Sequence, residues 1–278
     1  MSIFFALCAA GVYGVADFFG GRASRSVSAI VVTVLGQSAG FLGLLIFAVS
    51  SGVPTPGASD WIWGGIAGIA GSTGLLAFYR AMGSGFMTVV APISAVTATA
   101  LPVIIGLSTG ERPGVLALAG IPIALGAVAL VSDVLGPDHR RAPRQVILFA
   151  LISGATFGSL FVILNYTSDD AGLWPVVAMR VTSVPYMAIV MLLAKRRPSD
   201  ARGHYRVVFG SGVLDSAANA LYLLAVREGL MTVVAVIISF YPATTLLLAT
   251  RLDREKIHRP QAVGLGLAGI ALLMITLS

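Results

Sequence analysis

Ten apolar segments, each close to the length of a membrane-spanning helix, dominate this 278-residue chain. A helix needs about 20 largely apolar residues to cross the hydrocarbon core of a bilayer. Only helices and closed barrels satisfy all their backbone hydrogen bonds there, and barrel strands would be about half as long and alternate in polarity. The chain is therefore predicted to be an all-α polytopic membrane protein with ten transmembrane helices.

Short turns carrying Gly, Pro and charged residues separate the predicted helices. The helices are expected near residues 3–20, 29–49, 61–80, 86–107, 114–132, 145–165, 173–194, 206–226, 232–250 and 260–277. Only 11% of the residues are charged and 57% are hydrophobic, whereas a soluble domain carries about 25% charged residues. The longest polar connector predicts a first unit over 1–133, a linker over 134–144 and a second unit over 145–278.

The two units are related by an internal repeat. The segment Gly85–Ala91 (GFMTVVA) returns as Gly229–Ala235 (GLMTVVA), 144 positions later. The same gap-free offset pairs Tyr13 with Phe157, Phe78 with Tyr222 and Glu111 with Glu255. Because each unit has an odd number of helices, two copies in tandem must enter the membrane in opposite orientations. Inverted repeats of this kind are typical of secondary transporters, although a duplicated scaffold with no transport role is the alternative.

Basic residues predict the orientation of the chain in the membrane. One side of the ten-helix layout carries Arg22, Arg25, Arg80, Arg140, Arg141, Arg144, Lys195, Arg196, Arg197, Arg202, Arg206, Arg251, Arg254, Lys256 and Arg259. The other side carries only Arg112 and Arg227. The positive-inside rule then places both termini outside the cytoplasm, in a plasma or inner cell membrane. The net charge of +6 reflects these loops, and no aromatic-basic patch indicates a nucleic-acid partner.

Short motifs stand near the ends of several predicted helices: Tyr79–Ala81, Met87–Pro92 and Gly110–Pro113 in the first unit, and Ser239–Thr245 and Arg254–Lys256 in the second. They resemble those of EamA-type members of the drug/metabolite transporter superfamily. The resemblance covers nearly the whole chain. It implies two inverted five-helix halves and transport of small metabolites such as amino acids or related compounds, often by export. Members of the family are often drawn with cytoplasmic termini, which is the opposite of what this chain's charges predict.

Two ionisable residues fall at mid-depth in neighbouring predicted helices. Arg180 lies about seven residues into 173–194, and Asp215 about nine residues into 206–226. Burying such groups in a membrane costs about 2.5–3.5 kcal/mol each on insertion scales. Asn219 and Tyr222 continue the helix face of Asp215, and the three form a predicted polar stripe. Either Arg180 binds an anionic group of the substrate, or it forms a structural ion pair with Asp215.

The first unit has different polar residues at the corresponding positions. Gly36 and Gly71 occupy the repeat positions of Arg180 and Asp215. Gln37 lies directly after Gly36. Gln37 and Tyr79 are candidate substrate-binding residues, with a bond to a neighbouring helix and aromatic packing as their respective alternatives. Tyr13 is a further candidate for the cavity lining, with aromatic packing again as the alternative. Asp17 and Arg80 lie near the ends of their predicted helices. They could act as a coupling or gating pair, or simply extend toward the interface.

Prolines and glycines within the spans predict how the helices bend and pack. Pro92 and Pro102 fall in 86–107 and Pro242 in 232–250, where each removes a backbone donor. These positions are interpreted as hinges or cavity-lining sites, with a static kink as the alternative. Glycine-rich faces over 64–68 and 264–269 predict close helix packing.

These features favour a secondary transporter that moves a small-molecule substrate by alternating access. The three histidines lie in loops far apart in the sequence, so no catalytic set is predicted. The single cysteine excludes a cysteine-based metal cluster, and the absence of a phosphate-binding lysine loop argues against ATP hydrolysis by the chain itself. No cofactor, metal or ATPase partner is predicted, and the chain is expected to be a monomer or a homodimer. A passive channel or facilitator and an intramembrane enzyme are the alternatives.

Overall fold

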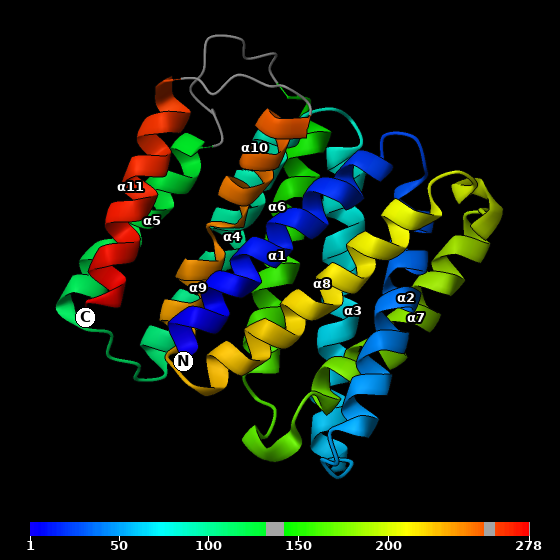
Figure 1. The fold of residues 1–278 in the computed structure, drawn as a ribbon, viewed down its shortest axis with the longest axis horizontal. Helices are drawn as coiled ribbons and strands as arrows, with labels where there is room; N and C mark the ends of the chain where they lie inside the picture. Colours follow the sequence, from blue (N-terminus) through cyan, green and yellow to red (C-terminus); the bar gives the residue numbers. More distant parts are fainter. Residues whose placement is uncertain (132–141, 253–258, 278) are drawn as a thin grey trace.

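The computed structural model describes residues 1–131, 142–252 and 259–277, and its long elements are all α-helices (Figure 1). They are α1 (Ser2–Ala23), α2 (Ala29–Ser50), α3 (Ala58–Met82), α4 (Met87–Ser108), α5 (Val115–Val131), α6 (Arg144–Leu164), α7 (Trp174–Leu193), α8 (Tyr205–Arg227), α9 (Met231–Ile238), α10 (Tyr241–Leu252) and α11 (Arg259–Thr276). Short 3-10 helices, η1 (Asp169–Ala171) and η2 (Pro198–Ala201), lie in two of the loops. Most of the linker predicted over 134–144 lies outside the described residues.

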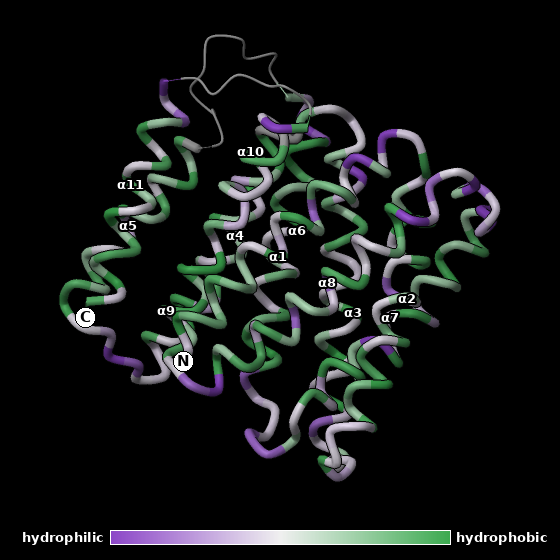
Figure 2. Tube along the Cα trace, viewed as in Figure 1, coloured by the Kyte–Doolittle hydropathy of each residue, from purple (hydrophilic) through white to green (hydrophobic). Residues whose placement is uncertain are grey.

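The helices are long and apolar enough to form a multi-pass membrane protein. Within the described ranges, nine candidate spans meet these criteria when α9 and α10 are taken together, and residues 115–130 form a shorter apolar helix. Hydrophobic residues cover the helix bodies, and hydrophilic residues gather at the helix ends (Figure 2). Large apolar side chains such as Ile46, Ile62 and Leu192 are exposed on the outer surface. Soluble proteins rarely expose such contiguous apolar surface, so this surface faces lipid.

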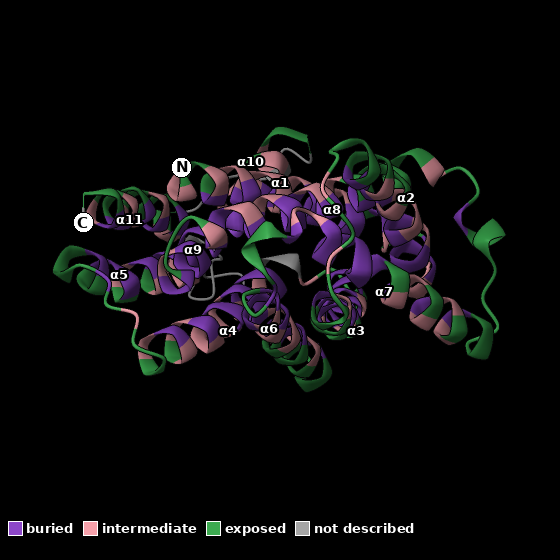
Figure 3. Cartoon of the chain, turned by 90° about the horizontal axis from the view of Figure 1, so that it is seen from below, coloured by how far each residue is buried: buried purple, intermediate pink, exposed green. Residues whose placement is uncertain are grey.

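Around the centre of the bundle the helices form two layers (Figure 3). Seen from below, α1, α8 and α2 lie on one side, and α4, α6 and α3 lie on the other (Figure 3). The main contacts join α1 to α8, α3 to α6 and α7, α4 to α6, and α2 to α8, while α5 and α11 pair at the edge. Both termini lie at the same end of the bundle (Figure 1).

Glycines allow the closest helix approaches, although not on every glycine-rich face. A Cβ atom added at Gly64 or Gly68 would strike the backbone of α7, so the predicted close packing of this face is present. In contrast, no atom of a described residue lies within 4 Å of a Cβ added at Gly266 or Gly269 of α11. The expectation of close packing was therefore wrong at these two positions, whereas Gly264 of the same helix is buried.

The ninth predicted helix is divided in two. Residues 232–250 were expected to form one helix, but α9 ends at Ile238 and α10 begins at Tyr241. Pro242 is the second residue of α10. N–H groups of the first turn have no partner within a helix, so the missing N–H group of proline costs no hydrogen bond there. Within a continuous helix its ring would clash with the carbonyl group of Ile238. In the first unit, Pro92 and Pro102 lie inside an unbroken α4.

Glu111 joins the two units by capping a helix of the other unit. Its carboxylate accepts hydrogen bonds from the backbone N–H groups of Met231 and Thr232, at 2.8 and 2.9 Å. These are first-turn amides of α9, which have no partner within the helix, and the helix dipole favours a negative charge there. Gly110 has a φ of +101°, which lets the chain turn so that Glu111 reaches α9. Its repeat equivalent, Glu255, lies outside the described residues.

We expect Glu111→Gln to lower the free energy of unfolding by about 1–2 kcal/mol, because the charge-assisted bonds to α9 become ordinary ones. The measurement is thermal unfolding of the purified protein in detergent. Glu228→Gln is the matched control. The Glu228 side chain is 47% exposed, and its ion pair with the terminal ammonium group, at 3.8 Å, is solvated, so losing it is expected to change stability little. Equal unfolding midpoints for the two variants would contradict a capping role for Glu111.

Candidate functional site

A small internal cavity lies between the two layers, with a volume of about 40 Å³. Its lining consists of Tyr13, Asp17, Gln37, Gly71, Leu75, Ala98, Phe157, Leu160, Phe161, Met179, Arg180, Asp215, Asn219, Ile238 and Tyr241. One water molecule needs roughly 10–15 Å³ of such volume, so the cavity holds only a few waters. A metabolite could enter only if the surrounding helices moved apart.

The charged centre of the cavity is an ion pair between α7 and α8. The Nη2 atom of Arg180 lies 2.6 Å from the Oδ2 atom of Asp215, and its Nε atom donates to the hydroxyl of Ser216 at 3.1 Å. Arg180 is 2% exposed and Asp215 is 6% exposed. A buried pair of this kind contributes little net stability, because desolvation offsets most of the attraction. The predicted pairing is present, and it is compatible with both a structural role and a substrate-binding role.

Two buried amides beside the ion pair have unused hydrogen-bonding capacity. Neither the Nε2 nor the Oε1 atom of Gln37 has a partner among the described residues. Asn219 donates from Nδ2 to the carbonyl oxygen of Asp215 at 2.7 Å, but its Oδ1 atom has no partner in the same part of the chain. An unsatisfied buried polar group costs about 1–3 kcal/mol. Because both side chains line the cavity, a molecule in the cavity could provide the missing bonds.

Asp17 belongs to this cavity and Arg80 does not. The first helix was expected to end near residue 20, but α1 continues to Ala23, which places Asp17 deeper than predicted. Asp17 is buried and lines the cavity. Arg80 is exposed, and its guanidinium lies over the ring of Phe149, 5.4 Å from the centroid. The structure therefore does not bring the two members of the predicted gating pair together.

The two tyrosines predicted to bind substrate are buried outside the cavity lining. Tyr79 packs against α1, where a Cβ added at Gly20 would overlap its ring. The hydroxyl of Tyr222 donates to the carbonyl oxygen of Phe161 at 2.6 Å, and the two rings are 4.5 Å apart. The predicted polar stripe on α8 therefore reaches the cavity at Asp215 and Asn219, while Tyr222 contributes to packing at its edge.

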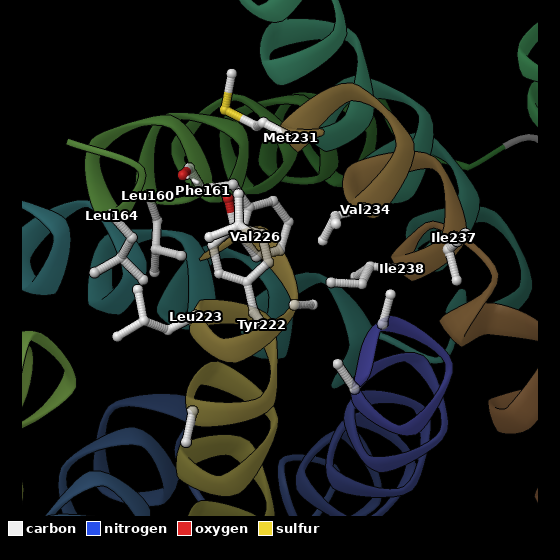
Figure 4. Close-up of a cluster of buried hydrophobic side chains, with 14 of the residues drawn as sticks. Leu160, Phe161, Leu164, Tyr222, Leu223, Val226, Met231, Val234, Ile237 and Ile238 are labelled. Atoms are coloured by element: carbon white, nitrogen blue, oxygen red, sulfur yellow. Dashed lines mark hydrogen bonds between the residues drawn. The ribbon is translucent and has the colours of Figure 1, made fainter. Parts of the chain in front are cut away.

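Apolar clusters close the bundle on both sides of the charged centre. One cluster contains Tyr222, Leu223 and Val226 at the end of α8, packed with Leu160 and Phe161 of α6 (Figure 4). The second cluster fills the opposite half of the bundle, where the largest fully buried side chains are Phe18, Phe78, Met82 and Met187. The lining of the central cavity is itself mostly apolar, so its few polar groups are surrounded by apolar side chains.

Sequence reasoning missed several residues of the site. Ser216 holds the Nε atom of Arg180, and Tyr241 lines the cavity at the break between α9 and α10. Phe157 also lines the cavity, as does Tyr13, which the sequence had already made a candidate for the lining. Phe157 is the repeat equivalent of Tyr13, so the offset could have indicated it. Nothing local distinguishes Ser216 from the other serines of the spans.

Comparison with known proteins identifies both units. The model of the family described as "EamA-like transporter family" matches residues 1–133 and 144–277. No curated protein matches the chain. One solved structure, titled "Crystal structure of protein", superposes with a TM-score of 0.73 and covers 99% of this chain and 96% of its own. Its sequence is 15% identical, so this likeness shows the shared fold alone.

Proposed function

We propose that this chain, which belongs to the EamA-like transporter family, is a secondary carrier of small polar metabolites. The observation that carries the proposal is the buried Arg180–Asp215 pair in a small central cavity lined by unsatisfied amides. Membrane proteins place ionisable groups inside the bilayer mainly along substrate and ion pathways. Substrate sites of secondary transporters lie near the midplane between the two repeats.

Amino acids or related compounds are the proposed substrate class. The guanidinium group of Arg180 matches a carboxylate in geometry and charge. Asp17 makes no ion pair with any described residue, and its carboxylate lines the same cavity, so it could receive an ammonium group. The amide group of Gln37 and the Oδ1 atom of Asn219 have no described partner and could bind the remaining polar atoms. A molecule with both an acidic and a basic group would satisfy this set.

Alternating access is the proposed mechanism, with the two units as inverted repeats. In Figure 1, α1 and α6 begin at opposite ends of the bundle, which supports opposite orientations of the units. The contact of α1 with α8 has its repeat counterpart in the contact of α6 with α3. We propose that the apolar clusters open in turn and that the break before Pro242, together with Pro92 and Pro102 in α4, provides the hinges. Export is the proposed direction.

The charge distribution supports an orientation with both termini outside the cytoplasm. The loops joining α1 to α2 and α7 to α8, and the starts of α6 and α8, lie at the end of the bundle opposite the termini (Figure 1). These segments contain Arg25, Lys195, Arg144 and Arg206, and basic loops remain in the cytoplasm. The proposed location is a plasma or inner cell membrane, and the proposed active form is a monomer or homodimer. Compartment-sensitive reporters fused to each terminus test the orientation, and cytoplasmic signals from both fusions would contradict it.

The proposed function predicts saturable exchange in proteoliposomes. Amino acids that stabilise the purified protein against heat are selected first, and their labelled forms are then exchanged across the vesicle membrane. Gln37→Leu is expected to weaken transport about tenfold, because a hydrogen bond of about 1–1.5 kcal/mol is lost. Thr33→Val is the matched control, because the Thr33 hydroxyl is also buried in α2 without a described partner but does not line the cavity.

The dependence of the flux on substrate concentration distinguishes the candidate mechanisms. Saturation with substrate, together with a selective defect in Gln37→Leu, supports a carrier with its site at the central cavity. Flux that rises without saturation indicates a channel or facilitator, and conversion of the substrate indicates an enzyme. Equal transport by Gln37→Leu and Thr33→Val would contradict a substrate contact at Gln37.

A further inference from the structure

We propose that a second pocket, at the basic end of the bundle, binds the headgroup of an anionic phospholipid. The pocket lies between the loop joining α1 to α2 and the ends of α3 and α7, and its volume is about 540 Å³. Small-molecule sites in proteins typically measure about 300–1,000 Å³. It shares no lining residue with the central cavity. We call it the arginine pocket, after its residues Arg25, Arg80 and Arg196.

The arginine pocket is strongly cationic. Its three arginines come from three different segments of the chain, and none of its lining residues is acidic. Within the described ranges, no carboxylate lies in ion-pair distance of any of them. Arg80 is held from one side by the ring of Phe149, which leaves its N–H groups available. The planar fork of arginine is well suited to binding phosphate oxygens through two parallel hydrogen bonds.

Hydroxyl and amide groups add further donors to the pocket. Ser26 and Ser28 line it, and neither hydroxyl makes a hydrogen bond to another described residue. Ser28 precedes the first turn of α2 without capping it. The backbone N–H groups of Ala29 and Ile30 have no partner within the helix, and both residues line the pocket. Phosphate groups bind well at such helix ends. The donors therefore complement the charge of the arginines.

The position of the pocket favours a lipid over a soluble anion. Leu76 and Arg80 continue an outer face of α3 on which Ile62, Ile66 and Ile69 are 60%, 44% and 48% exposed. These residues recur at helical spacing, so an apolar stripe runs along α3 from the pocket into the membrane. A phospholipid can place its phosphate among the arginines and lay its acyl chains along this stripe. Basic pockets between helices at the cytoplasmic side are a recognised mode of anionic lipid binding.

Lipid binding to the purified full-length protein tests the proposal. Phosphatidylglycerol and phosphatidylcholine with identical acyl chains are titrated into detergent-solubilised protein, and bound lipid is counted by native mass spectrometry. We expect phosphatidylglycerol to bind selectively and to raise the thermal unfolding midpoint. The double variant Arg25→Gln/Arg196→Gln is expected to bind it roughly 10- to 30-fold more weakly, because two phosphate contacts are lost.

A matched variant separates a specific pocket from general attraction to the basic surface. Arg202→Gln/Arg206→Gln also removes two exposed charges at the same end of the bundle but leaves the pocket lining intact. This control is expected to bind phosphatidylglycerol like the unmodified protein. Equal weakening in both double variants, or equal binding of the two lipids, would overturn the proposal.

A soluble headgroup distinguishes the lipid from a free phosphate ligand. Glycerol phosphate carries the same phosphate chemistry without acyl chains, so it is expected to stabilise the protein far less than phosphatidylglycerol at equal concentration. Equal stabilisation by glycerol phosphate, lost in Arg25→Gln/Arg196→Gln, would identify a site for soluble phosphate and overturn the lipid assignment.

Discussion

Replacing Arg180 with glutamine is expected to abolish transport by this protein. Among the described residues, Arg180 supplies the only basic group that lines the central cavity, so the variant loses the group proposed to bind the substrate carboxylate. The substitution also leaves Asp215 buried without its partner. Breaking a buried ion pair in this way costs about 3–5 kcal/mol, so reduced stability is expected as well. The measurements are exchange in proteoliposomes and thermal unfolding in detergent.

The double variant Arg180→Gln/Asp215→Asn separates the two effects. Because it removes both charges, the penalty for an unpaired buried charge disappears, and stability is expected to return close to that of the unmodified protein. Transport is expected to stay lost. Restored transport would show that the pair only joins α7 to α8. Ser216→Ala is a milder control, because it removes one hydrogen bond to Arg180 and leaves the ion pair intact.

Replacing Gly212 with alanine is expected to destabilise the bundle by about 3 kcal/mol or more. A Cβ atom at this position of α8 would overlap the backbone of Gly36 in α2. Backbone cannot move aside as a flexible side chain can, so the two helices must separate. Gln37 follows Gly36, so the same separation is expected to displace its amide from the cavity and reduce transport. Unfolding midpoints and the yield of monodisperse protein measure the effect.

Gly210→Ala is the matched control on the same helix. Within the described part of the chain, no atom lies within 4 Å of a Cβ added at Gly210, so the new methyl group makes no close contact. Alanine is favoured over glycine in a helix by up to about 1 kcal/mol, and this variant is expected to be at least as stable as the unmodified protein. Similar midpoints for Gly212→Ala and Gly210→Ala would contradict close packing of α2 against α8.

Much of the fold could be predicted because its signals are local. The segment expected over 29–49 is α2 (Ala29–Ser50), and the segment expected over 145–165 is α6 (Arg144–Leu164). Apolar length alone defines such helices in a bilayer. The prediction was poorer where a single residue outweighed the apolar pattern, as at the break between α9 and α10 before Pro242.

The site could be predicted only in part, because a helix face does not identify the residues that it meets. Arg180 and Asp215 could be paired because both are costly at mid-depth and lie in consecutive helices. Tyr222 shares the predicted face of Asp215, but its hydroxyl is bound to the backbone of α6. Asp17 was expected near a helix end and instead lines the cavity. The position of Tyr222 depends on Phe161, which lies 61 positions away in the chain.

The sequence by itself determined that this chain crosses the membrane many times, that it contains two related units, and that ionisable groups lie within its spans. These properties follow from composition, length and spacing along one chain. The tertiary structure decided which polar groups are in contact, which have no partner and that Glu111 caps α9. In the sequence Glu111 is only a loop residue, because the amide of Met231 that it binds lies 120 positions away. Helix packing sets such partners, because contacts between distant segments depend on the shapes of all the faces between them.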